Sequence, residues 1–240
     1  MNQSERKMIK RNLLTSSLCL VLLLMMLLSS TLAWFTDSKG NVNVMTAGKI
    51  GIDQVETFEQ NTYIMPNVPI TKNVVVKNTG NQEAYVRTLF AFEDNADGMV
   101  LSKLILTKPD SVQIVIPGVT DTNAKVQFTV TKDGVTTLYT VGYYIHDDAL
   151  AVNGEKSSIN PLQSITLDGS ATNAWHEAVG TTYEVIVLSQ ATQVVGMESF
   201  NGAAGALNAA FDEITGTSCA MWFDAVIGDN NDVVAAYPAP

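Results

Sequence analysis

Residues 125–145 constrain the fold of this chain more than any other segment. The first seven alternate polar and apolar side chains, which is the pattern of a half-buried strand. One face carries Val126, Phe128 and Val130. The pair Asp133-Gly134 follows, and then a second run rich in β-branched residues. An Asp-Gly pair between two such runs favours a tight turn. We therefore predict a β-hairpin over residues 125–145 with that face towards the core.

Strand-like runs recur along most of the chain. Residues 70–78 and 84–92, separated by the turn cluster 79–81, suggest a second hairpin. Residues 183–195 predict another long strand, and Asn160-Pro161 predicts a turn before a short strand at residues 165–167. Strands at this spacing with little helix are typical of an all-β fold. We expect an antiparallel, jelly-roll-like β-sandwich.

The last quarter of the chain breaks this pattern. Apolar residues recur at three- and four-residue intervals over residues 199–215, which predicts an amphipathic helix capped by Ser199 and ended by Gly216. We expect it to close one end of the sandwich, with an intersubunit or membrane-surface role as the alternative. The apolar residues 219–223 suggest a last strand, and residues 228–240 a loose tail.

The N-terminus has the pattern of an export signal. A basic cluster at residues 6–11 precedes an apolar run at residues 18–28 and small residues at 29–31. This run is short for a membrane span, which needs about 20 apolar residues, so a cleaved signal is favoured over an uncleaved anchor at residues 13–35. Small residues at Thr31 and Ala33 place the cut between Ala33 and Trp34.

Charge and cysteine content narrow the classes of function. The 207 residues after Ala33 carry 10 basic and 23 acidic side chains, a net charge of −13. Such a chain repels phosphate backbones, so we expect no nucleic-acid binding. Cys19 follows Leu18 rather than a small residue, which argues against a lipoprotein signal, and Cys219 is then the only cysteine after the cut. No intramolecular disulfide is therefore expected.

The order of these features resembles the TasA, camelysin and CotN family of exported Gram-positive proteins, whose leaders are cut by the signal peptidase SipW. The resemblance spans residues 13–197 and includes the leader end, with Ala33, Trp34-Phe35 and Asp37. It continues through four further segments: residues 44–52, 69–80, 154–167 and 187–193. The predicted helix at residues 199–215 lies outside the pattern.

The resemblance implies a jelly-roll subunit that is secreted, trimmed and assembled into filaments of a biofilm matrix or cell surface. In TasA-like fibres the freed N-terminal segment completes the sheet of the next subunit. Its implied partners are further copies of the chain and a SipW-type signal peptidase, with membrane contact only before trimming.

Residues 34–52 have a pattern that suits strand donation. One face carries an apolar side chain at four alternating positions, namely Val42, Val44, Ile50 and Ile52. Such a strand can pair with a neighbour's sheet edge. The alternative is an ordinary first strand of its own sandwich.

Catalytic and metal motifs are sparse. Camelysin-like proteins have been classed as metalloproteases, but a zinc peptidase needs two histidines one helical turn apart, and His146 and His176 are thirty residues apart. Residues 93–98 begin like a calcium loop, yet Leu104 stands where the bidentate glutamate belongs. Arg87, the only arginine after the leader, is expected to pair with a cross-strand acid. We expect no enzyme activity, catalytic residue, metal site or cofactor.

The sequence thus predicts a signal peptide at residues 1–33, a β-sandwich at 34–197 and a helix with a tail at 198–240. We expect donor-strand complementation by the N-terminal strand to build the filament. The alternatives are a monomeric surface-binding β-sandwich module and a camelysin-like secreted metalloprotease.

Overall fold

The computed structural model describes residues 7, 8, 10, 12–18, 20, 49–58, 64–179, 183–227 and 232–237. The chain divides into two units, Met1–Thr46 and Ala47–Pro240. In the first unit the described residues are helical and exposed. Across the described residues, no helix is both long and apolar enough to span a membrane. The predicted cleavage residues Ala33 and Trp34 and the predicted strand residues Val42 and Val44 lie outside the described residues.

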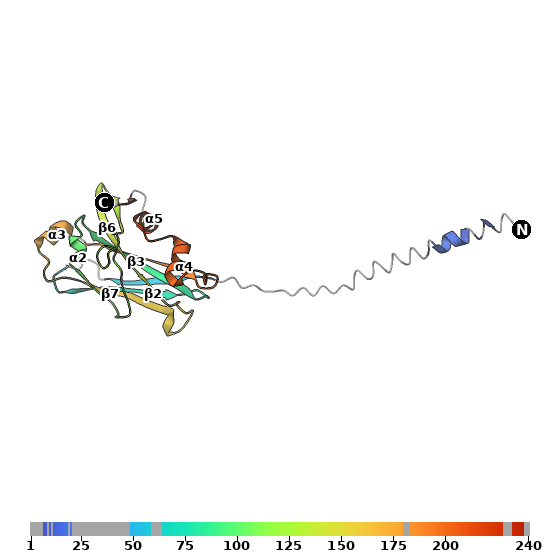
Figure 1. Ribbon diagram of the computed structural model, residues 1–240, viewed down its shortest axis with the longest axis horizontal. Helices are drawn as coiled ribbons and strands as arrows, with labels where there is room; N and C mark the ends of the chain where they lie inside the picture. The colour runs from blue at the N-terminus through green and yellow to red at the C-terminus, as the bar shows by residue number, and fades with distance from the viewer. Residues whose placement is uncertain are drawn as a thin grey trace. The chain divides into compact units, whose positions relative to one another are not determined.

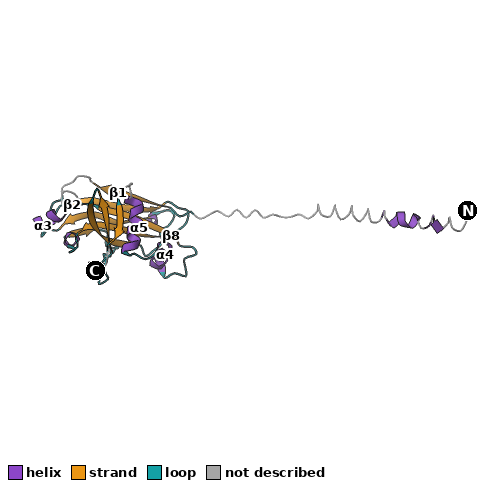
Figure 2. Ribbon diagram, turned by 90° about the horizontal axis from the view of Figure 1, so that it is seen from above, coloured by secondary structure: helices purple, strands orange, loops and turns teal. Residues whose placement is uncertain are grey.

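The second unit is built on two antiparallel sheets (Figures 1 and 2). Sheet A has the strand order β1 (Ile52–Phe58), β2 (Pro69–Asn78), β7 (Ser158–Leu167) and β4 (Leu104–Thr107). Sheet B has the order β8 (Val185–Gln193), β3 (Ala84–Asp94), β6 (Val135–Ile145), β5 (Gln127–Lys132) and β9 (Val233–Ala236). This mostly-β, sandwich-like architecture confirms the prediction of an all-β sandwich.

Sheet B packs on both of its faces. Alternate residues of β3 point to opposite sides, so Val86, Phe90 and Phe92 enter the core between the sheets. Their neighbours Leu89 and Ala91 enter a second core under the C-terminal helices. This arrangement makes β3 apolar at nearly every position rather than alternating.

The predicted hairpin at residues 125–145 is confirmed. Strands β5 and β6 pair from Lys132 and Val135 outwards, and Asp133 and Gly134 adopt positive φ angles of 50° and 81°. These angles suit a two-residue hairpin turn. Phe128 and Val130 are buried, but in the core under the helices rather than in the core between the sheets.

Two other strand predictions are wrong in detail. Strands β2 and β3 belong to different sheets, so residues 79–81 connect the two sheets instead of turning a hairpin. Asn160-Pro161 does not end a strand, because β7 runs through it. The register against β2 shifts between Thr71 and Val76, and this irregularity accommodates a proline within a strand.

The C-terminal prediction also needs correction. The predicted helix at residues 199–215 is shorter, α4 (Gly202–Phe211), and Ser199 does not cap it. Gly216 begins a second helix, α5 (Gly216–Ile227), which includes the residues 219–223 predicted as a strand. Part of the predicted loose tail forms β9 and pairs with β5.

The helices cover two parts of the sandwich. In Figure 1, α5 lies on the side of β6, away from β7. Helix α4 packs against β3 and β8, and α5 packs against β5 and β9. They cover the outer face of sheet B, not an end of the sandwich.

The short helices α2 (Met99–Ser102) and α3 (Asn173–Val179) pack together around Trp175. A 3-10 turn, η1 (Glu155–Ser157), precedes β7.

Candidate functional site

The described end of the predicted assembly strand lies within its own sandwich. Ile50 and Ile52 pack against the core between the sheets, and Ile52 pairs with Asn78 of β2. Just before them, the backbone N–H of Lys49 donates to Asn81 Oδ1 over 2.6 Å, and the Lys49 carbonyl accepts from Asn81 N over 2.9 Å. Two of the four predicted assembly residues therefore pack within the chain's own sandwich.

Strand β1 forms one edge of sheet A and carries polar side chains on its inner face. Gln54 Nε2 donates to Glu56 Oε1 over 2.7 Å and lies 3.2 Å from the Val187 carbonyl of β8. Glu56 Oε2 pairs with the buried Lys72 at 2.5 Å, and the ammonium lies over the Phe58 ring. Gln54 therefore links β1 to β8, where the edges of the two sheets approach each other.

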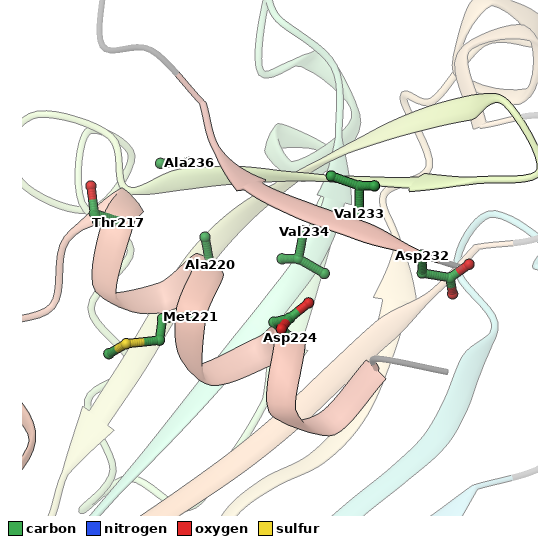
Figure 3. Close-up of a pocket in the computed structure, with 8 residues that line it drawn as sticks. All are labelled: Thr217, Ala220, Met221, Asp224, Asp232, Val233, Val234 and Ala236. Atoms are coloured by element: carbon green, nitrogen blue, oxygen red, sulfur yellow. The ribbon is translucent and has the colours of Figure 1, made fainter. Parts of the chain in front are cut away.

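A groove of about 470 Å³ lies between α5 and β9 (Figure 3). Thr217, Ala220, Met221 and Asp224 line its helical side, at the spacing of one helix face. The strand side is lined by Asp232, Val233, Val234 and Ala236. Figure 3 shows Ala220, Asp224 and Val234 in the space between helix and strand, with Val233 on the opposite side of the strand. This groove combines a sheet edge with an exposed helix face.

Arg87 does not form the predicted ion pair with a cross-strand acid. It is fully buried, and its guanidinium donates to three neutral oxygens: Gln190 Oε1 at 2.7 Å, Asn208 Oδ1 at 2.9 Å and the Asp212 carbonyl at 3.2 Å. It also stacks 4.8 Å from the centre of the Trp222 ring. Burial lowers the pKa of Arg87 to about 10, which leaves it charged at neutral pH.

The Arg87 cluster anchors the helical layer to sheet B. Its acceptors come from β8, from α4 and from the residue that follows α4. That residue, Asp212, has φ 70° and ψ 171°, a backbone region that favours glycine. Beside the guanidinium, burial raises the pKa of Cys219 to about 12. The cysteine is therefore an inert packing residue.

A second polar cluster lies on the outer face of sheet B. Tyr139 Oη donates to Glu184 Oε2 over 2.7 Å, and the backbone N–H of Glu184 donates to Glu93 Oε2 over 3.1 Å. Burial, aided by the negative charge of Glu184, raises the pKa of Glu93 to about 7. Glu93 therefore titrates near neutral pH.

The candidate metal residues have other partners. His146 Nδ1 shares a 2.9 Å hydrogen bond with Tyr144 Oη, and the His176 ring packs edge-on against Trp175. In the segment resembling a calcium loop, Asp94 and Asn95 accept from the backbone N–H groups of Leu101 and Met99 at the start of α2. Within the described ranges, no group of three His, Cys, Asp or Glu side chains could hold a metal ion.

Sequence reasoning missed both the Arg87 acceptors and the groove. Gln190, Asn208 and Asp212 are more than 100 residues from Arg87 in the chain, and neutral acceptors leave no charge pattern. The groove had one usable signal. Residues 217, 220, 221 and 224 follow helical spacing, which could have identified α5 as a helix.

Comparison with protein-family models, with curated proteins and with solved structures finds no match.

Proposed function

We propose that this chain is a secreted structural subunit that assembles into filaments of an extracellular matrix or cell surface. In this proposal the signal peptide is cut after Ala33. Residues 34–48 then pair as a donated strand with the sheet of a neighbouring subunit, and the sandwich has a jelly-roll topology.

One observation carries the proposal: the sandwich has its own first strand without residues 34–48. Strand β1 begins at Ile52 and pairs with β2 along its whole length. Residues 34–48 lie outside the described residues, and in the sequence they carry Val42 and Val44 on one face. An alternating segment that precedes the chain's own paired first strand can add to the sheet edge of a neighbour.

The negative net charge after residue 33 suits an extracellular structural role more than binding to anionic polymers. The Cys219 thiol is buried and its pKa is raised, so the subunit lacks an exposed thiol in the described residues. In an oxidising compartment the subunit would therefore not cross-link through that residue.

The test compares two substitutions in the secreted chain that begins at Trp34. Val44→Asp would bury an unpaired charge in the neighbour and should abolish filaments seen by negative-stain microscopy, while thermal unfolding stays unchanged. Ile50→Asp should lower the melting temperature, because Ile50 packs on its own core.

Three outcomes would contradict the proposal. Wild-type secreted chains that stay monomeric at high concentration would favour a monomeric surface-binding module. Chelator-sensitive cleavage of casein would favour a protease. A membrane-retained chain that still begins at Met1 would contradict trimming.

A further inference from the structure

Strand β9 leaves one backbone edge of sheet B unpaired within the described residues. It is the last strand in the sheet order, and among the described strands it pairs only with β5. The N–H of Tyr237 donates to Gln127 O over 3.2 Å. Backbone directions alternate along a strand, so the N–H groups of Val234 and Ala236 point away from β5, towards the open side. An added strand would find donors and acceptors there.

Helix α5 lies beside β9 and packs on sheet B. Its buried residues, including Cys219 and Phe223, face the strands of sheet B. Thr217, Met221 and Asp224 instead line the groove beside β9 (Figure 3). Ala220 and Val234 lie between helix and strand, and Met221, which also lines the groove, is 59% exposed. The groove therefore has apolar side chains beside a sheet edge, which is the geometry of strand addition.

The charge around the groove limits what can occupy it. Residues 177–240 contain eight acidic side chains and no Lys, Arg or His. Asp232 pairs with Lys132 at 3.4 Å, whereas Asp224 takes part in no ion pair among the described residues. Pairing two β9 edges from two copies would bring these carboxylates together, and like charges disfavour that arrangement. The groove instead suits a strand with a positive net charge.

The N-terminal segment of the same chain has this chemistry. Residues 34–48 contain one base, Lys39, and one acid, Asp37, and trimming after Ala33 adds a positive α-amino group, which makes the segment's net charge positive. Val42 and Val44 supply an apolar face to meet Met221. The segment has 15 residues before Lys49, which at about 3.3 Å per residue is far longer than the four-residue edge of β9.

We propose that the groove between α5 and β9 is the acceptor site for residues 34–48 of a second copy. The incoming strand pairs with the open edge of β9, extends sheet B by one strand and lies alongside α5. This assignment rests on the proposed filament function and identifies the surface that binds the donated strand.

Disulfide cross-linking between two variants that each add one cysteine to the chain tests the assignment. One secreted chain carries Val44→Cys and the other carries Met221→Cys. The unsubstituted chain, in which Cys219 is buried, gives the background level of cross-linking. Val55→Cys is the matched control, because Val55 is 51% exposed and lies on β1, the edge of the other sheet. We expect mixed dimers with Met221→Cys at least about tenfold above those with Val55→Cys.

The outcomes separate the two proposals. Filaments that cross-link equally well or better through Val55→Cys would overturn the acceptor site but keep the proposed function. A double variant that cross-links only within one chain would show that the segment binds its own groove, which also overturns the assignment. Absence of filaments in the parent chain would overturn the proposed function itself.

A backbone variant provides a second test. Ala236→Pro removes an N–H that points to the open side and leaves the ladder to β5 intact, whereas Ala236→Gly keeps this N–H. We expect Ala236→Pro to raise the concentration needed for assembly at least about tenfold relative to Ala236→Gly, with similar melting temperatures. Equal assembly of the two variants would overturn the acceptor site.

Discussion

The two faces of sheet B are stabilised in different ways. Between the sheets, the core consists of aliphatic and aromatic side chains such as Val74, Phe90 and Leu162. On the outer face, the core under α5 adjoins a fully buried arginine with neutral acceptors. The inner core can therefore tolerate exchange of one apolar side chain for another of similar size. The outer layer depends on directional hydrogen bonds, which fix where α4 and α5 sit.

This difference matters because the groove belongs to the outer layer. Arg87 holds Asp212, the first residue of the connection between α4 and α5, and stacks on Trp222 of α5. Four substitutions in the outer layer, ordered by expected effect, test how that layer is stabilised.

The largest effect is expected for Arg87→Ala. It leaves the buried Gln190 and the half-buried Asn208 without their donor, empties the space of a fully buried side chain and removes the contact with Trp222. We therefore expect a loss of about 4–6 kcal/mol in the free energy of unfolding. Cys219 should also become reactive towards thiol reagents before global unfolding. Denaturant titration with thiol labelling measures both. A loss below about 1 kcal/mol would mean that the outer layer does not need the arginine.

Phe128→Ala tests the apolar part of the same layer. Phe128 stacks 4.9 Å from Phe223 and 5.4 Å from Tyr139, measured between ring centres. We expect a loss of about 3–5 kcal/mol in thermal or denaturant unfolding. Thr129→Ala, on the other face of β5, should cost less than about 1 kcal/mol. Equal losses at both positions would show that the hairpin register is wrong by one residue.

Glu93→Gln tests the polar cluster through its pH dependence. The folded pKa of Glu93, about 7, lies above its ordinary value of 4.5, so the native state holds the proton more tightly than the unfolded state. Its contribution is favourable at low pH and is lost as pH rises from 4.5 through 7. The substitution should therefore stabilise the protein by about 2 kcal/mol at pH 8, after allowance for partial exposure, and change little at pH 4. Unfolding curves at both pH values check this; equal shifts at both would contradict it.

The smallest effect is expected for Asp212→Gly. Glycine adopts the observed φ of 70° and ψ of 171° without strain and keeps the carbonyl that accepts from Arg87. We expect a gain of about 0.5–1 kcal/mol, since relief of strain outweighs the entropic cost of glycine. A destabilised variant would show that the Asp212 side chain contributes more than the backbone strain costs.

Local patterns predicted the strands but not how the sheets combine. Alternation over residues 125–131 and the Asp133-Gly134 turn identified a hairpin, because both signals lie within about 20 residues. The turn cluster at residues 79–81 predicts a change of direction, yet it cannot indicate that β2 and β3 enter different sheets. Residues 219–223 are a short apolar run, which fits a strand and a buried helix equally well.

The candidate groove could not be predicted from the sequence for a similar reason. Strand β9 has four residues and no alternation of polar and apolar side chains, so only its pairing with β5 defines it. The predicted assembly residues Ile50 and Ile52 were recognised as an apolar face. Their packing on the chain's own core depends on contacts with β2 and the loop at residues 79–81.

The most direct test of the account is whether the sandwich folds without the segment proposed to be donated. A chain that begins at Lys49 keeps β1 and its pairing with β2. Sedimentation velocity and thermal unfolding should show a folded monomer that melts within a few degrees of a chain beginning at Trp34, and that does not form filaments. An unfolded chain, or filaments that form without residues 34–48, would contradict the account.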